Sequence, residues 1–94
     1  MTIVVSPQAG KDLREAYEFI HKDNPIAADR VLAHIVGVIG MLASEAVTGR
    51  AVLLQDGRWV KTWPVPPYRI YYRASGQELQ VIRVYHQARR PIER

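Results

Sequence analysis

The sequence contains no cysteine, a single phenylalanine and no long uninterrupted apolar run. The absence of cysteine excludes disulfide bonds and thiolate metal sites. Small secreted domains often depend on such cross-links, so we expect a cytoplasmic protein. The opening residues MTIVVSPQAG have no basic stretch ahead of an apolar run, so we expect no signal peptide. The longest apolar stretch, residues 31–42, is interrupted by His34, Gly37 and Gly40, so we expect no membrane span.

Acidic residues are scarce in the second half of the chain. Residues 1–49 carry four basic and six acidic side chains, a net charge of −2, whereas residues 50–94 carry nine basic and three acidic ones, a net charge of +6. Such a positive field favours association with nucleic acid or with an acidic protein partner. An ordinary solvated surface is the alternative, because charge does not report on fold. The length of 94 residues predicts one domain, residues 1–94.

The first half of the chain predicts a strand followed by a helical hairpin. Residues 2–5 (TIVV) are mostly β-branched, which is typical of a strand. Ser6-Pro7 and Asn24-Pro25 each place an N-cap residue before a proline at the first helical position. Apolar residues then recur at helical spacing. In the first helix they are Leu13, Ala16, Tyr17 and Ile20; in the second they are Ala27, Ala28, Val31, Leu32, Ile35, Val38, Ile39 and Leu42.

Two further expectations concern these helices. In the first helix, four charged residues occupy the side opposite the apolar stripe and should face solvent: Lys11, Asp12, Glu15 and Glu18. In the second, Gly37 and Gly40 each cost about 1 kcal/mol relative to alanine. We therefore expect these glycines to permit close packing against another backbone.

The second half of the chain predicts strands. The candidates are residues 51–54, which could equally be a link, and residues 59–63, 68–73 and 79–86. Asp56-Gly57 and Ser75-Gly76 mark turns between them. Pro64, Pro66 and Pro67 cannot lie in the middle of a sheet, so they belong to an edge or an irregular link. The predicted fold is α+β in the order β-α-α-β-β-β, with the helical hairpin packed on one face of an antiparallel sheet.

The stretch YRIYYR, residues 68–73, alternates arginine and tyrosine. Because successive strand side chains point to opposite faces, Ile70, Ile82 and Val84 should face the helices. The same alternation places Arg69, Tyr71, Arg73, Arg83 and Tyr85 on an opposite, uncovered face. That face suits phosphate or carboxylate groups, since arginine offers a bidentate fork. A solvated sheet face with cross-strand Arg–Tyr packing is the alternative.

The whole chain resembles the RelE/ParE superfamily of toxins from bacterial toxin–antitoxin pairs. The resemblance lies in SPQAGKDLREAYEFI, NPIAADRVLAHI, Gly49-Arg50, YRIYYR and VIRVYHQARR. Together NP-x-AA, YRI-x-Y and V-x-H-x-x-R are fairly specific, and the long helical hairpin and the ending are closer to the ParE branch.

This resemblance implies a small cytoplasmic toxin with no cofactor, which inhibits DNA gyrase by protein contacts and performs no chemical step. It also implies a cognate antitoxin with an acidic toxin-binding segment, and contact with DNA only indirectly, through the antitoxin complex. The residues that we expect to contact the target or the antitoxin are Arg69, Arg73, Arg83, Tyr85, Arg89 and Arg90. The last two lie in a tail that could equally be a frayed end.

Two alternatives remain within the same superfamily. RelE-like members cut mRNA on the ribosome, and Arg69, Arg83 and His86 match positions of their catalytic groups. No carboxylate matches the central position of that set, so the set is incomplete. His86 is either a structural histidine on the core side of its strand or, if the strand ends at Tyr85, a site residue. A non-toxic co-repressor that acts with the antitoxin is the other alternative. No metal-ligand spacing is present, so we expect no metal site.

Overall fold

The computed structural model describes residues 1–94 and contains two helices and five strands. In chain order they are β1 (Thr2–Val5), α1 (Pro7–His21), α2 (Pro25–Ala43), β2 (Arg50–Leu53), β3 (Trp59–Val65), β4 (Tyr68–Ser75) and β5 (Glu78–His86). The predicted α+β class and order are confirmed, and the stretch that could have been a link forms β2.

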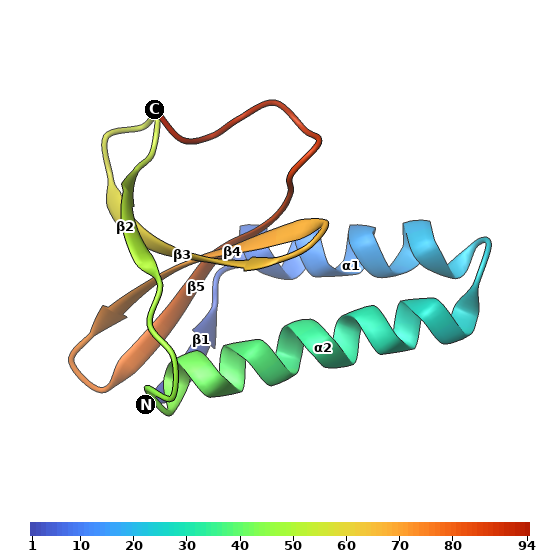
Figure 1. The fold of residues 1–94 in the computed structure, drawn as a ribbon, viewed down its shortest axis with the longest axis horizontal. Helices are drawn as coiled ribbons and strands as arrows, with labels where there is room; N and C mark the ends of the chain where they lie inside the picture. Colours follow the sequence, from blue (N-terminus) through green and yellow to red (C-terminus); the bar gives the residue numbers. More distant parts are fainter.

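The strands form one mixed sheet in the order β1-β5-β4-β3-β2. The pairings β2–β3, β3–β4 and β4–β5 are antiparallel, as predicted. Strand β1 pairs parallel to β5, from Thr2 opposite Glu78 to Val5 opposite Val81. The first strand therefore lies beside the last one, although the two are far apart in the sequence (Figure 1).

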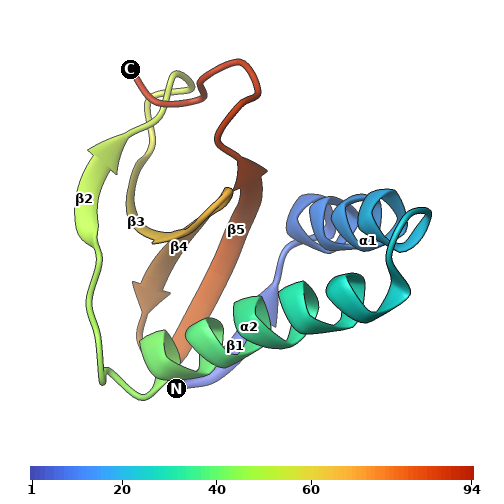
Figure 2. The same ribbon diagram turned by 45° about the vertical axis from the view of Figure 1, so that its right-hand side comes forward.

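Both helices begin at the residues that the sequence indicates. The Oγ atom of Ser6 accepts a hydrogen bond of 3.0 Å from the N–H group of Ala9. The Oδ1 atom of Asn24 accepts one of 3.0 Å from Ala27. These side chains satisfy N–H groups that have no partner within the helix. The resulting hairpin covers one face of the curved sheet, here called the helix face (Figure 2).

The main hydrophobic core lies between the hairpin and the helix face. Helix α2 contributes Ile35, Val38, Ile39, Leu42 and Ala43 to it. The sheet contributes Val65, Tyr68, Ile70, Tyr72, Leu79, Val81 and Val84. By length and composition α2 could cross a membrane, but the core helix of a soluble protein passes the same test.

The proline-rich stretch lies where the sequence places it, at an edge. Strand β2 pairs with β3 only as far as Thr62, opposite Arg50. Pro64 lies beyond that point, where β3 has β4 on one side alone. Its missing N–H group therefore interrupts no ladder. The Pro66–Pro67 peptide bond in the following turn is cis.

The prediction for the helix glycines is wrong, and a different glycine is the tightly packed one. Gly37 and Gly40 are exposed, and a Cβ atom added to either would meet nothing within 4 Å. At Gly49, just before β2, an added Cβ atom would lie 2.2 Å from the carbonyl oxygen of Thr62. The N–H group of Gly49 donates a hydrogen bond of 2.7 Å to the hydroxyl of Tyr72. Gly49 therefore holds the start of β2 against β3.

A β-bulge in β5 changes which side chains face the helices. Tyr71 pairs with Arg83 and Tyr72 pairs with Val81, so Ile82 is an extra residue on β5. Val81 and Val84 both belong to the main core, whereas Ile82 packs on the other face. The strict alternation that placed Ile82 beside Val84 is wrong because a bulge shifts it by one residue.

Candidate interaction surface

The face of the sheet turned away from the hairpin, here called the far face, is not the uncovered basic surface that alternation predicts. A second hydrophobic cluster is buried there, made of Val52, Leu54, Val60, Tyr71 and Ile82. Tyr71 is only 3 % exposed. The prediction is wrong because strand β2 and the end of the chain supply apolar side chains that cover the middle of this face.

The last residues of the chain, 91–94, are not a frayed tail. The N–H group of Gln55 donates a hydrogen bond of 2.8 Å to the carbonyl oxygen of Ile92. The N–H group of Arg94 donates one of 2.9 Å to the carbonyl oxygen of Leu53. The chain therefore arches from the end of β5 to the end of β2 and pairs with it (Figure 1). We call residues 91–94 the C-terminal segment.

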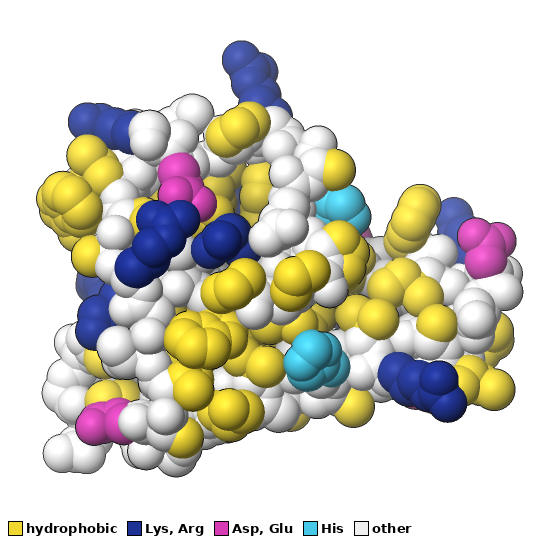
Figure 3. All heavy atoms as spheres, in the orientation of Figure 1, with side chains coloured by type: hydrophobic (Ala, Val, Ile, Leu, Met, Phe, Trp, Pro, Cys, Tyr) yellow, Lys and Arg dark blue, Asp and Glu magenta, His cyan; other side chains and the backbone are white.

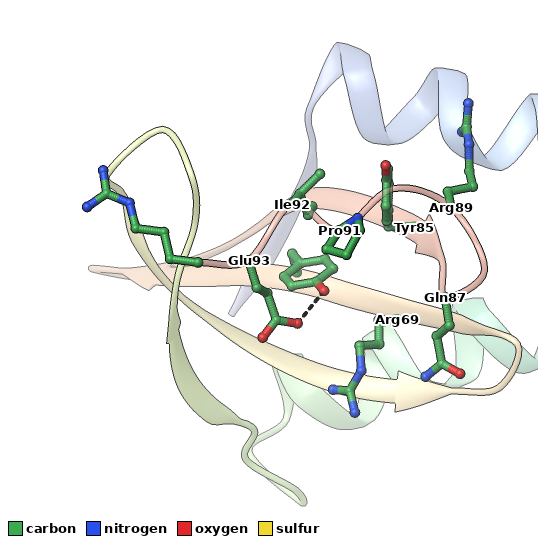
Figure 4. Close-up of a pocket in the computed structure, with 9 residues that line it drawn as sticks. Arg69, Tyr85, Gln87, Arg89, Pro91, Ile92 and Glu93 are labelled. Atoms are coloured by element: carbon green, nitrogen blue, oxygen red, sulfur yellow. Dashed lines mark hydrogen bonds between the residues drawn. The ribbon is translucent and has the colours of Figure 1, made fainter.

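Tyr71 ties the C-terminal segment to the sheet. Its hydroxyl donates a hydrogen bond of 2.6 Å to Oε2 of Glu93, drawn as a dashed line in Figure 4. A guanidinium nitrogen of Arg50 lies 3.8 Å from the same carboxylate. Burial and the hydrogen bond to Glu93 raise the pKa of Tyr71 well above its usual value. Tyr71 therefore stays neutral and acts as a hydrogen-bond donor.

A hollow of about 440 Å³, here called the C-terminal hollow, lies between the C-terminal segment and strands β4 and β5. Arg69, Tyr85, Gln87 and Arg89 are among its lining residues. The polar ends of Arg69, Gln87 and Glu93 point to the same side, whereas Arg89 points away from them (Figure 4). Lys and Arg side chains gather mainly over this sheet half of the molecule (Figure 3). The hollow can therefore receive an anionic group.

Two arginines lie over the ring of Tyr85 at the border of this hollow. The guanidinium carbon of Arg83 lies 4.9 Å from the centre of the Tyr85 ring, and that of Arg89 lies 5.6 Å from it. Both distances are within the range of cation–π attraction. The Tyr85 hydroxyl donates a hydrogen bond to the carbonyl oxygen of Arg90, whose side chain is exposed. Tyr85 therefore contacts both arginines through its ring and the backbone of Arg90 through its hydroxyl.

Arg83 is not a free surface cation. Its Nε atom lies 2.8 Å from Oδ2 of Asp12, and its Nη2 atom donates a hydrogen bond of 3.0 Å to Oδ1. The same carboxylate accepts a hydrogen bond of 3.0 Å from the backbone N–H group of Val84. The hydrogen bond to Asp12 raises the pKa of Arg83. This pair joins helix α1 to strand β5. It lies just beyond Val81, the last residue of β5 that pairs with β1.

Asp12 is a further residue that sequence reasoning placed wrongly. We expected it to face solvent, but the residue is 5 % exposed and its side chain only 2 %. A signal was available, because Asp12 lies three residues after Ala9 and four before Ala16, and both pack in the core. A carboxylate on the buried stripe of a helix requires a partner, and an arginine on a neighbouring strand is a usual one.

His86 lies on the helix face, on the core side as alternation predicts. Its ring packs edge-on against Tyr68, with the ring centres 5.1 Å apart. Its Nδ1 atom accepts a hydrogen bond of 3.0 Å from the N–H group of Ala88. His86 is half-buried and lines a cleft of about 350 Å³ together with Glu15 and the exposed Phe19 of α1.

Comparison with known proteins places this architecture in a family. The family model for the ParE toxin of type II toxin–antitoxin systems, parDE, matches residues 3–91 of the 94 residues. The chain belongs to the ParE toxin family. No functionally curated protein is similar enough in sequence to count as a relative.

Solved structures share the ParE-family fold. The chromosomal ParDE toxin–antitoxin system from P. aeruginosa matches with a TM-score of 0.75 and 22 % identity, covering 92 % of this chain and 95 % of that one. The YoeB dimer from Staphylococcus aureus matches with a TM-score of 0.57 and 13 % identity, over 92 % and 95 %. A YoeB/ParE toxin from Agrobacterium tumefaciens matches with a TM-score of 0.54 and 25 % identity, over 92 % and 98 %.

The residues of interest in this ParE-family chain are spread over three places. Arg69 and Arg89 line the C-terminal hollow, and Arg89 also reaches the cleft that contains His86. Arg73 and Arg83 line a third hollow near the start of α1. The three residues of the RNA-cleavage hypothesis, Arg69, Arg83 and His86, therefore line different hollows. No group of three or more His, Asp or Glu side chains could hold a metal ion.

Proposed function

We propose that residues 1–94 form a single cytoplasmic toxin domain that inhibits DNA gyrase through protein contacts and is neutralised by a cognate antitoxin. Membership of the ParE family supports the target. The observation that supports the choice of mechanism is that Arg69, Arg83 and His86 line different hollows. Cleavage of RNA requires a base, an acid and a cation around one phosphate, which is more readily met by side chains that line one hollow.

The C-terminal hollow is the surface that we assign to gyrase. Arg69 and Arg89 line it, and Arg90 lies exposed on the loop that encloses it. The C-terminal segment fixes that loop, since its backbone pairs with the end of β2. A rigid loop presents its arginines at a lower entropic cost than a free tail would, which favours contact with a protein surface.

The antitoxin is assigned to Arg69 on the far face and to an open sheet edge. Strand β1 is an edge strand, and Ile3, Val4 and Val5 are 39 to 43 % exposed. An extended segment of a partner can pair with such an edge. Its acidic side chains would bind Arg69 in the C-terminal hollow, so that the antitoxin covers the surface that we assign to gyrase.

A RelE-like ribonuclease is the second candidate, and the YoeB dimer and the YoeB/ParE toxin among the structural neighbours favour it. For that function, Arg69 would have to approach His86 from the opposite face of the sheet. A non-toxic co-repressor is the third candidate and would require antitoxin binding without gyrase inhibition.

Purified gyrase provides the test. We expect the protein to abolish supercoiling of a relaxed plasmid and to accumulate gyrase-bound, cleaved DNA. Pre-incubation with the protein encoded beside it should restore supercoiling. Unimpaired supercoiling at a large excess of the folded protein would exclude gyrase as the target. Inhibition that the neighbouring gene product fails to relieve would exclude that protein as the antitoxin.

A further inference from the structure

The third hollow, of about 590 Å³, lies where β1 leads into α1. We call it the N-terminal hollow. Three arginines line it, Arg58, Arg73 and Arg83, with Gln8 and Gln80 between them. No carboxylate lines it. Arginine and amide side chains without a carboxylate form a surface that attracts anions.

Two of these arginines are held in place, and one is free. Arg83 is fixed by Asp12, at 2.8 Å. Arg58 is held by Asp56, also at 2.8 Å. Arg73 is exposed and takes part in no ion pair within the chain, so its guanidinium fork is available to a ligand.

The N-terminal hollow continues toward the C-terminal hollow. A smaller hollow, which Asp56 also lines, shares Arg58 and Arg83 with the N-terminal hollow and Ile92 with the C-terminal hollow. Arg69 and Arg73 lie four residues apart on β4 and on the same face, a distance of about 13 Å along the strand. This arrangement fits an extended ligand with repeated negative charges better than it fits a single small anion.

We propose that this face binds the phosphate backbone of a nucleic acid directly. Guanidinium groups bind phosphate with two parallel hydrogen bonds. Of the three hydrophobic residues in the N-terminal hollow, Val81 and Ile82 are buried and Val4 is exposed, so the arginine and glutamine side chains supply its hydrogen-bond donors. The binding is additional to the protein contacts with gyrase and does not depend on them.

The test is fluorescence anisotropy of short labelled DNA and RNA oligonucleotides with the purified protein over a range of salt concentrations. The double variant Arg58→Gln/Arg73→Gln removes two cations from the N-terminal hollow. The matched control, Lys22→Gln/Arg30→Gln, removes two exposed cations from the helical hairpin and leaves the same net charge. All four side chains are exposed, so both variants should fold, which circular dichroism verifies.

We expect the hollow variant to bind several-fold more weakly than the control in low salt. For the hollow variant, the slope of log Kd against log salt concentration should be smaller by about 1.4 for single strands and by about 1.8 for duplexes. These are the changes expected when two phosphate contacts are lost. Equal slopes and affinities in the two variants would overturn the proposal. Tighter binding of a glutamate-rich peptide of equal charge, abolished in the hollow variant, would also overturn it and assign the hollow to an acidic protein. The assay contains no gyrase, so its failure leaves the gyrase proposal standing.

Discussion

At the scale of single residues, Asp12 stabilises the fold through specific contacts between helix α1 and strand β5. Its carboxylate binds Arg83 and the N–H group of Val84. Asp12→Ala leaves the guanidinium group and this N–H group without their partner, so it should lower the free energy of unfolding by about 2–3 kcal/mol, less than for a fully buried pair because Arg83 is partly exposed. Urea denaturation measures this loss.

The control is Glu15→Ala, on the same helix but exposed, which should change the free energy of unfolding by less than about 0.5 kcal/mol. Equal losses in the two variants would contradict the role of Asp12.

Tyr71 should make stability depend on alkaline pH. Its folded-state pKa is raised above the ordinary value of 10.0, so its contribution to stability is complete below pH 10. Above pH 10 the unfolded chain loses the phenolic proton while the folded chain keeps it, and stability falls. We therefore expect the melting temperature to fall less steeply above pH 10 in Tyr71→Phe than in the unmodified protein. A parallel fall in both would show that Tyr71 titrates normally when folded.

The sequence predicted which residue types would matter better than it predicted where their side chains lie. Arg69 and Tyr85 do border a hollow on the far face, as alternation suggests. Tyr71 and Arg83 were assigned to an open surface and are instead engaged, one with Glu93 and one with Asp12. Both partners are distant in the sequence, and strand periodicity carries no information about them.

At the scale of elements, the glycines provide a paired test. Gly37 and Gly40 lie within α2 with open space around them, so Gly37→Ala and Gly40→Ala should each stabilise the protein by about 0.5–1 kcal/mol. Thermal unfolding would detect the change. Destabilisation by either substitution in the isolated chain would show that this helix face packs closely after all.

Gly49 should respond in the opposite direction. An added Cβ atom would collide with the backbone of Thr62, so β2 would have to move away from β3. We expect Gly49→Ala to cost about 1–3 kcal/mol, as overpacking does. Hydrogen exchange of the β2 amides should quicken at the same time. Unchanged stability would mean that β2 contributes little to the fold.

Local signals determine most of the elements but not their exact pairing. Ser6-Pro7 and Asn24-Pro25 start the helices because the caps and prolines act within a few residues. The bulge at Ile82 and the pairing of residues 91–94 with β2 depend on strands from elsewhere in the chain. For this reason the fold was predictable, whereas the covered far face was not.

At the scale of the whole molecule, the basic sheet half should govern association. Arg69→Glu places a negative charge in the C-terminal hollow, and it should weaken binding of the acidic antitoxin segment by about tenfold, equivalent to about 1.4 kcal/mol. Arg30→Glu makes the same change on the exposed side of α2 and should have a small effect. Isothermal titration calorimetry with the antitoxin compares the two. Equal affinity for both variants would remove Arg69 from the interface.

The most direct test of the account follows both candidate targets with one preparation of the protein. Supercoiling by gyrase, with a check for trapped cleaved DNA, runs beside coupled translation in which the ends of the mRNA are mapped. We predict loss of supercoiling, trapped cleaved DNA and intact mRNA. Codon-phased mRNA cleavage with normal gyrase activity would contradict the account and would make Arg69, Arg83 and His86 candidates for catalysis.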